Sequence, residues 1–382
     1  MTALDELVLA EAARRGKVTF AEFMDWALYH PQHGYYTSGA PRTGRQGDFY
    51  TNVHSGSLFA RLLVESFLEM WDYLGSGRFT LVELGAGDGV LAERIFRAFE
   101  EKGRHRDLSY FLVERSPWSR ELARRRLSRF ARVRILDDLR SLEHTSGVEG
   151  CVFSNEFFDA LPFHRVLWKD GALRELYVVA EGGRLVERPA EPSTPRLAAY
   201  LKEQGVSLAE GQRTEICLLL EDLLAELERS LARGFVFSID YGEPSLDLQR
   251  EDRVNGTRQV YRKHRLLDDP FEEAGERDIT AFVDFGRLAA LGLRGDFRPL
   301  VFASQGAYFL NSAEDFLRRA VEGDGGRGGD VSLKAAVQQL LHPRSLGGAF
   351  QILIQGKNVG DPVLRGGRVN RLHRLASPSA KK

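Results

Sequence analysis

A carboxylate and three glycines follow a short apolar run early in the chain. Glu83 precedes Gly85, Gly87 and Gly89 in the sequence Val-Glu-Leu-Gly-Ala-Gly-Asp-Gly. Glycine lets the backbone turn tightly and approach a ligand with no Cβ in the way. The residues that follow have the pattern of a helix, so its free N–H groups would face whatever lies over the glycines. This arrangement predicts a site for a nucleotide-like cofactor.

The spacing of the glycines helps to decide which cofactor binds. A dinucleotide site uses G-x-G-x-x-G, whereas Val90 stands here in place of the third glycine of that motif. The next apolar run ends in a second acid, Glu114. E-x-G-x-G-x-G with such an acid resembles the S-adenosylmethionine (SAM) site of class I methyltransferases. A dinucleotide site with a degraded motif and a turn with no ligand stay as alternatives.

A second group of polar side chains follows the apolar run at 150–154. Asn155, Glu156 and Asp159 lie close together, and the two carboxylates can share one face of a helical turn. Two converging carboxylates suit a cationic acceptor, because each oxygen can accept from a guanidinium fork. The alternative is a helix start whose acids only offset its dipole. Asp240 ends a later strand and is either a functional residue or the start of a turn.

Strands and helices alternate around these residues. We expect strands at 79–84, 108–114, 132–136, 150–154, 235–240, 297–302 and 350–355, with helices at 90–102 and 118–128. Such alternation specifies a parallel sheet with right-handed crossovers, and ligands bind at the carboxyl ends of its strands. The predicted fold class is α/β, a Rossmann-like sheet of seven strands.

Helices precede this sheet and a further segment interrupts it. Helical periodicity covers 4–15, 19–29 and 58–73, and Thr19 with Glu22 forms a capping box at the second start. After Pro162, residues 164–168 and 173–180 predict a β-hairpin, followed by helices at 195–204 and 213–233. Residues 242–258 are polar and rich in turn formers, and we expect a mobile lid there.

The composition excludes several classes of protein. The net charge of −1 indicates no general attraction to nucleic acid or to an anionic membrane, and no apolar run is long enough for a membrane span. Cys151 and Cys217 are too few for a disulfide framework or a zinc cluster. We therefore expect no metal site and a reducing, cytoplasmic location. The tail after Asp361 is basic, and we expect it to be flexible or, alternatively, to dock an acidic partner.

Six segments occur in the order that is typical of one known family. They are His30-Pro-Gln-His-Gly-Tyr-Tyr36, Gly47-Asp-Phe-Tyr-Thr51, Val82-Glu-Leu-Gly-Ala-Gly-Asp-Gly89, Asn155-Glu-Phe-Phe-Asp-Ala-Leu-Pro162, Asp240-Tyr-Gly242 and Asp278-Ile-Thr-Ala-Phe-Val-Asp-Phe285. Together they resemble the MidA family of SAM-dependent methyltransferases over residues 18–357. Two positions depart from its pattern: Thr51-Asn-Val-His-Ser55 lacks the family's usual acid, and Phe282 replaces a histidine.

The resemblance implies a fold, a cofactor and a set of site residues. It implies a class I methyltransferase core at 76–360 with an N-terminal helical extension and lid at 1–75, an insertion at 163–233 and a basic tail at 361–382. SAM would be held by a set of glycines and acids: Asp48, Thr51, Glu83, Gly85, Gly87, Glu114, Asp137 and Asp138. Asn155, Glu156, Asp159 and Asp240 would form the acceptor side. The mitochondrial member of the family methylates arginine in a subunit of respiratory complex I, which implies a protein substrate.

Methyl transfer needs alignment of the acceptor atom with the methyl group. A guanidinium has a pKa of about 13.8, so its charge must be held away from the attacking nitrogen. Glu156 and Asp159 would do this and accept the released proton. The alternatives are an assembly chaperone that binds SAM with little catalysis and, less favoured because of Val90, a nicotinamide-dependent oxidoreductase. A homodimer is also open.

Overall fold

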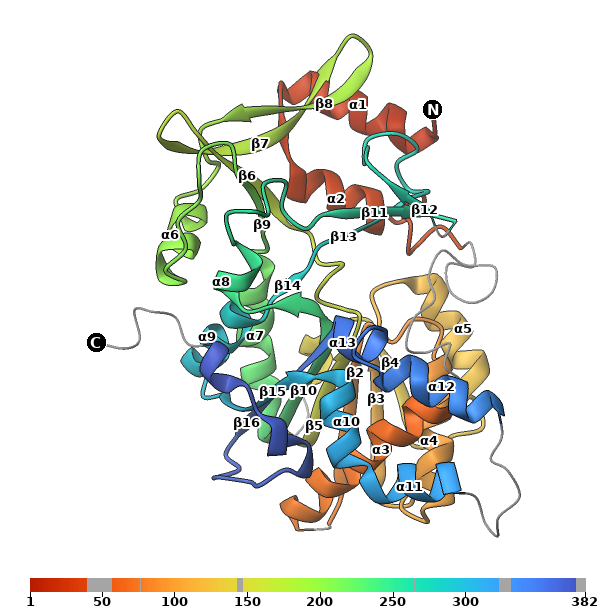
Figure 1. Cartoon of the computed structure of the whole chain (residues 1–382). Helices are drawn as coiled ribbons and strands as arrows, with labels where there is room; N and C mark the ends of the chain where they lie inside the picture. The colour runs from red at the N-terminus through yellow and green to blue at the C-terminus, as the bar shows by residue number, and fades with distance from the viewer. Residues whose placement is uncertain (40–56, 76, 143–146, 264, 323–330, 376–382) are drawn as a thin grey trace.

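The computed structural model describes residues 1–39, 57–75, 77–142, 147–263, 265–322 and 331–375. Asp48 and Thr51 lie outside these residues. Figure 1 shows a central sheet with helices on both faces and, beside it, a second and smaller sheet that packs against the N-terminal helices. Among the described residues, no helix has the length and apolar character required to cross a membrane.

The central sheet contains the seven predicted strands. They are β2 (Phe79–Leu84), β3 (Leu108–Val113), β4 (Val133–Leu136), β5 (Val148–Asn155), β10 (Leu231–Glu243), β15 (Arg298–Ser304) and β16 (Phe350–Lys357). Their spatial order is β15-β16-β10-β5-β2-β3-β4, and β16 is antiparallel to both of its neighbours. The chain order reverses between β2 and β5, so a ligand crevice is expected at the carboxyl ends of these two strands. The predicted α/β fold class is confirmed.

Two apolar layers cover the faces of this sheet. One contains α3 (Ser57–Leu74), α4 (Val90–Glu101), α5 (Pro117–Leu127), α10 (Gln305–Ser312), α11 (Glu314–Glu322), α12 (Val331–Leu341) and α13 (Leu346–Ala349). The other contains η2 (Leu139–Leu142), α7 (Leu219–Ser230) and α9 (Phe285–Arg294). The central strands are therefore buried on both faces, which explains their continuous apolar sequences.

The second sheet is built mainly from the segment after Pro162. Its strands are β1 (Val18–Thr19), β6 (His164–Lys169), β7 (Ala172–Glu181), β8 (Arg184–Ala190) and β9 (Arg213–Ile216), with α6 (Arg196–Glu203) between β8 and β9. We call β6 to β9 the inserted sheet. The β6–β7 hairpin is confirmed: both of its turn residues, Asp170 and Gly171, have positive φ, as a two-residue turn of this kind needs.

The N-terminal helices α1 (Ala3–Arg15) and α2 (Phe20–Tyr29) pack against the second sheet. The predicted capping box at α2 is confirmed, because the Thr19 side chain accepts from the Glu22 amide while Glu22 accepts from the Thr19 amide. A third sheet joins β11 (Gln259–Arg262), β12 (Arg265–Leu267) and β13 (Asp278–Thr280), and β14 (Val283–Asp284) pairs with the end of β10.

The structure differs from three expectations about local structure. The helix predicted at 213–233 is β9, then α7, then the start of β10, because Arg213–Ile216 pairs with β6. The segment 242–258, predicted as a mobile lid, contains α8 (Ser245–Leu248) and is hydrogen bonded to the inserted sheet. The tail, predicted to be flexible from residue 361, forms η3 (Arg365–Val369) and η4 (Leu372–Arg374) on the central unit. Residues 376–382 lie outside the described part of the chain.

Candidate active site

A cavity of about 1310 Å³ opens at the carboxyl ends of β2, β3, β5 and β10. This exceeds the roughly 300–1,000 Å³ of a typical small-molecule site, so it has room for a cofactor and part of an acceptor. Its described lining has nine acidic side chains, namely Glu83, Asp88, Glu114, Asp137, Asp138, Glu156, Asp159, Glu226 and Asp278, and two arginines, Arg94 and Arg115. The cavity therefore favours cationic ligands.

The glycine loop forms one wall of the cavity. Gly85, Gly87 and Gly89 have φ values of 67°, 55° and 77°, a region that other residues rarely adopt. A Cβ on Gly85 would lie 2.8 Å from the ring of Phe157, whereas a Cβ on Gly87 would point into open space. The loop backbone is exposed at Gly85 and half-buried at Gly87, and α4 begins directly after Gly89. Both features allow a polar ligand to approach the backbone closely.

Two acids support this loop in different ways. Glu114 accepts the amide of Gly87 through Oε2 at 2.9 Å and that of Ser116 through Oε1 at 2.7 Å, and burial raises its pKa. Glu83 accepts the hydroxyl of Tyr110 at 2.6 Å, and burial raises its pKa to about 8. Burial therefore favours the protonated form of Glu83. Glu114 is the better placed of the two for ligand hydroxyl groups, as in nucleotide sites of this topology.

Asp137 and Asp138 line the cavity beyond the end of β4. Asp138 accepts the backbone amide of Arg140 at 2.8 Å and its guanidinium at 2.6 Å, and these contacts lower the pKa of Asp138. Apolar side chains from η2 and α7 line the same part of the cavity: Leu139, Leu219 and Leu223. An apolar slot edged by acids suits a heterocyclic ring with polar edges. The glycine loop, Glu114 and this slot together fit the parts of SAM.

Three predicted acceptor residues meet in the cavity where β5 ends. Asn155, Glu156 and Asp159 all line it, and the Asn155 amide donates to Glu156 Oε1 at 3.0 Å. Glu156 has a φ of 53°, an uncommon left-handed conformation for this residue type. Burial raises the pKa of Asp159 well above its usual range, and Asp240, Glu156 and Asp278 add to this shift. A bound cation would therefore favour the ionised form of Asp159.

Asp240 needs a correction, because it does not line the cavity. Its Oδ2 accepts the amides of Phe157, Phe158 and Asp159 at 3.1, 2.9 and 3.4 Å, and its Oδ1 accepts that of Tyr241 at 2.9 Å. It is fully buried, which raises its pKa to about 7. Asp240 therefore positions the turn that carries Asp159.

Asp278 is a site residue absent from the sequence prediction. It lines the cavity, is only 3% exposed and accepts the Tyr36 hydroxyl at 2.8 Å. Thr280, Ala281 and Phe282 line the same cavity. The signal that could have identified Asp278 is its place in the Asp278–Phe285 segment, one of the six segments that carry the family resemblance.

Comparisons with known proteins agree with this geometry. A family model described as "Putative S-adenosyl-L-methionine-dependent methyltransferase" matches residues 62–302. A crystal structure of a Burkholderia thailandensis protein bound to S-adenosyl-homocysteine superposes with a TM-score of 0.87 at 30% identity, covering 97% of this chain and 96% of that one. The rat protein arginine methyltransferase NDUFAF7, mitochondrial, is 28% identical, covering 88% of this chain and 80% of its own. Its Drosophila melanogaster homologue is 29% identical, with coverages of 72% and 67%.

The relatives also correct the predicted location. Both NDUFAF7 proteins are named as mitochondrial, which contradicts the cytoplasmic location expected above. The physical reason for the error is that a low cysteine content separates reducing from oxidising compartments. It does not distinguish one reducing compartment from another.

Proposed function

Because this chain belongs to the family of SAM-dependent methyltransferases, we propose that it methylates the guanidinium of an arginine in a protein. SAM is the cofactor and supplies an electrophilic methyl group. The observation that carries the proposal is the group of three carboxylates in the cavity: Glu156, Asp159 and Asp278. The names of the NDUFAF7 relatives, protein arginine methyltransferases, support it.

The aromatic side chains around these carboxylates fit the same acceptor. Tyrosines 29, 36, 241 and 261 line this part of the cavity. The Tyr29 hydroxyl donates to the carbonyl of Ala160 at 2.9 Å, and that of Tyr36 donates to Asp278. A planar cation is attracted to aromatic faces and to carboxylates together. A lysine ammonium would use the charges but not the planar geometry.

The three carboxylates also provide for the proton that the reaction releases. A guanidinium nitrogen attacks only when its lone pair is not delocalised into the cation, so an acid must hold the charge at the other nitrogens. A buried carboxylate with a raised pKa is a stronger base than one in water. We propose Asp159 as the group that takes the proton, with Glu156 and Asp278 binding the guanidinium.

For the cofactor, we propose that Gly85, Gly87 and Glu114 hold SAM, with Asp137 and Asp138 at the adenine end and Glu83 supporting the loop. Asp48 and Thr51 stay predictions. We also propose that residues 76–360 form the methyltransferase core, that 163–233 are an insertion and that 1–75 cover the site. The pairing of β7 with β1, away from the central sheet, supports this division. The homodimer stays a prediction.

Glu114→Gln is expected to weaken the binding of SAM and of S-adenosyl-homocysteine by about 10–100-fold, because the new amide donor faces the Gly87 amide and a charged acceptor is lost. Titration calorimetry measures this change. Glu121→Gln on the exposed face of α5 is the control and should keep the wild-type affinity. An unchanged affinity in Glu114→Gln would remove this residue from the cofactor site.

The acceptor is tested with SAM that carries a deuterated methyl group and a library of peptides with a single arginine. A matched library has lysine at that position. We expect deuterated methyl on arginine and none in the lysine library, detected by fragmentation mass spectrometry. Methyl on lysine would contradict the proposed acceptor. Binding of SAM with no transfer to arginine would favour the assembly-chaperone alternative.

A further inference from the structure

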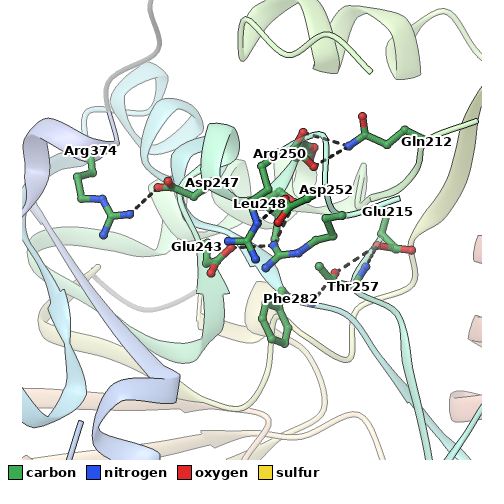
Figure 2. Close-up of polar contacts among 12 residues, drawn as sticks. Gln212, Glu215, Glu243, Asp247, Leu248, Arg250, Asp252, Thr257, Phe282 and Arg374 are labelled. Atoms are coloured by element: carbon green, nitrogen blue, oxygen red, sulfur yellow. Dashed lines mark hydrogen bonds and ion pairs between the residues drawn. The ribbon is translucent and has the colours of Figure 1, made fainter. Parts of the chain in front are cut away.

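The segment between β10 and β11 connects the inserted sheet to the wall of the cavity. We call residues 244–258 the connecting segment. Its start carries α8, where Asp247 pairs with Arg374 of the tail at 2.8 Å. Further along, Arg253 donates to Glu243 at 2.7 Å and to the Leu248 carbonyl at 3.1 Å. Figure 2 shows these contacts together with those of Gln212 and of Thr257 described next.

The inserted sheet holds the middle of the connecting segment through the residues at the start of β9. The buried Gln212 side chain donates to the carbonyls of Gln249 and Arg250, both at 3.1 Å. The Arg213 amide donates to the carbonyl of Val254 at 2.8 Å. Backbone groups are thus paired between two parts of the chain that are far apart in sequence, so the position of the segment follows that of β9.

Glu215 of β9 makes the closest of these contacts. Its Oε2 accepts the amide of Thr257 at 2.7 Å and the hydroxyl of the same residue at 3.2 Å. Its Oε1 lies 3.4 Å from Nε of Arg165, a fully buried side chain of β6. Gly256 has a φ of 74°, and a Cβ there would lie 2.5 Å from both carboxylate oxygens. The chain therefore passes Glu215 too closely for any larger residue.

The Thr257 hydroxyl joins this contact to the cavity. While it donates to Glu215, it accepts the backbone amide of Phe282 at 3.1 Å (Figure 2). Phe282 lines the cavity, and the guanidinium of Arg253 lies 5.7 Å from its ring centroid. The preceding amide, that of Ala281, donates to the carbonyl of Asp159 at 3.0 Å. Two neighbouring amides of this wall are thus hydrogen bonded, that of Ala281 to the turn that carries Asp159 and that of Phe282 to Thr257.

We propose that Thr257 is a positioning residue for the acceptor. Its hydroxyl sets the position of Phe282 relative to Asp159 and so transmits the geometry of the inserted sheet to the acceptor end of the cavity. Thr257 itself is not in the cavity lining. The inference rests on the proposed use of that end by an arginine. If the hydroxyl only stabilised the fold, its removal would change the free energy of unfolding alone. The test therefore measures the KM for an acceptor peptide and hydrogen exchange at the Phe282 amide.

Thr257→Val and Thr257→Ser are the informative pair. Valine keeps the β-branched shape and removes the hydroxyl, whereas serine keeps the hydroxyl. In Thr257→Val we expect hydrogen exchange at the Phe282 amide to accelerate by about tenfold and the KM for an arginine peptide to rise by about fivefold, since one hydrogen bond is lost. The kcat and the affinity for SAM should change by less than about twofold. Thr257→Ser should have the wild-type exchange rate at Phe282 and the wild-type KM.

A matched control is Thr194→Val. The Thr194 hydroxyl accepts the Arg196 amide at 3.3 Å, and Thr194 does not line the cavity. It should leave exchange at Phe282 and the KM at wild-type values. Equal exchange at Phe282 in Thr257→Val and wild type would overturn the inference, as would a loss of SAM affinity as large as the change in KM. If the wild type methylates no arginine peptide, the proposed acceptor fails, and the exchange measurement still decides the role of Thr257.

Discussion

Asp159→Asn and Glu156→Gln are each expected to lower kcat/KM for arginine methylation by about 10²–10⁴-fold, the usual contribution of a positioned acid or base. Both changes keep the shape of the side chain and remove a negative charge from the acceptor end. The affinity for SAM should stay within about threefold of wild type, because the Gly87 amide of the glycine loop is held by Glu114, which both variants keep. Transfer of deuterated methyl to an arginine peptide measures the first quantity and calorimetry the second.

The pH dependence separates the two residues. The pKa of Asp159 is raised in the protein without acceptor, first by burial and then by Asp240, Glu156 and Asp278. A protonated Asp159 cannot accept the proton that the reaction releases, so kcat/KM should rise as the pH rises through this pKa, and Asp159→Asn should lose that dependence. Asp252→Asn, an exposed change in the connecting segment, is the control. Full transfer by both Asp159→Asn and Glu156→Gln would disprove the proposed mechanism.

The cofactor end of the site could be predicted because its signals are local. Gly85, Gly87 and Gly89 all adopt the positive φ that glycine permits, and the flanking strand and helix follow from apolar periodicity over a few residues. The parallel pairing of β2, β3, β4, β5 and β10 also follows from their alternation with helices. Nothing in this inference requires knowledge of a contact between distant parts of the chain.

The errors fall where a distant partner decides the local structure. Arg213–Ile216 continues an amphipathic helical pattern, yet it pairs with β6 and becomes a strand. Strand preference depends on such neighbours more than on the residues themselves. The tail is similar: Arg365 bonds to Glu69 and Arg374 to Asp247, acids that the basic sequence does not reveal. A run of basic residues therefore does not by itself predict whether a tail is ordered, because the acids that it contacts lie elsewhere in the sequence.

Asp240 and Asp278 show the same limit within the site. Both were acids in segments of plausible chemistry, and the sequence favoured Asp240 because it ends a core strand. The structure reverses this ranking, since the oxygens of Asp240 accept four backbone amides while Asp278 lines the cavity. A buried acid at a strand end either contacts a ligand or holds a turn. Only the position of the neighbouring amides distinguishes these roles.

The largest expected effect on stability concerns Glu83. Its pKa of about 8 in the folded protein lies above its ordinary value of 4.5, because the carboxyl is 4% exposed. The folded state therefore keeps a proton that the unfolded state releases. The stabilisation from protonated Glu83 is complete below about pH 4.5 and is lost as the pH rises through about 8. From pH 6 to 9 this residue should lower the free energy of unfolding by about 2–3 kcal/mol.

Glu83→Gln isolates this contribution. Glutamine can still accept the Tyr110 hydroxyl and never ionises, so the excess stability of the variant over the wild type should grow by about 2–3 kcal/mol from pH 6 to pH 9. Urea unfolding across this range measures both curves, with Glu121→Gln as the exposed control. The raised pKa values of Glu114 and Asp240 are common to all three proteins and cancel in the difference. Parallel curves for Glu83→Gln and wild type would mean that Glu83 is ionised inside the folded protein, and its carboxylate would then be available to SAM.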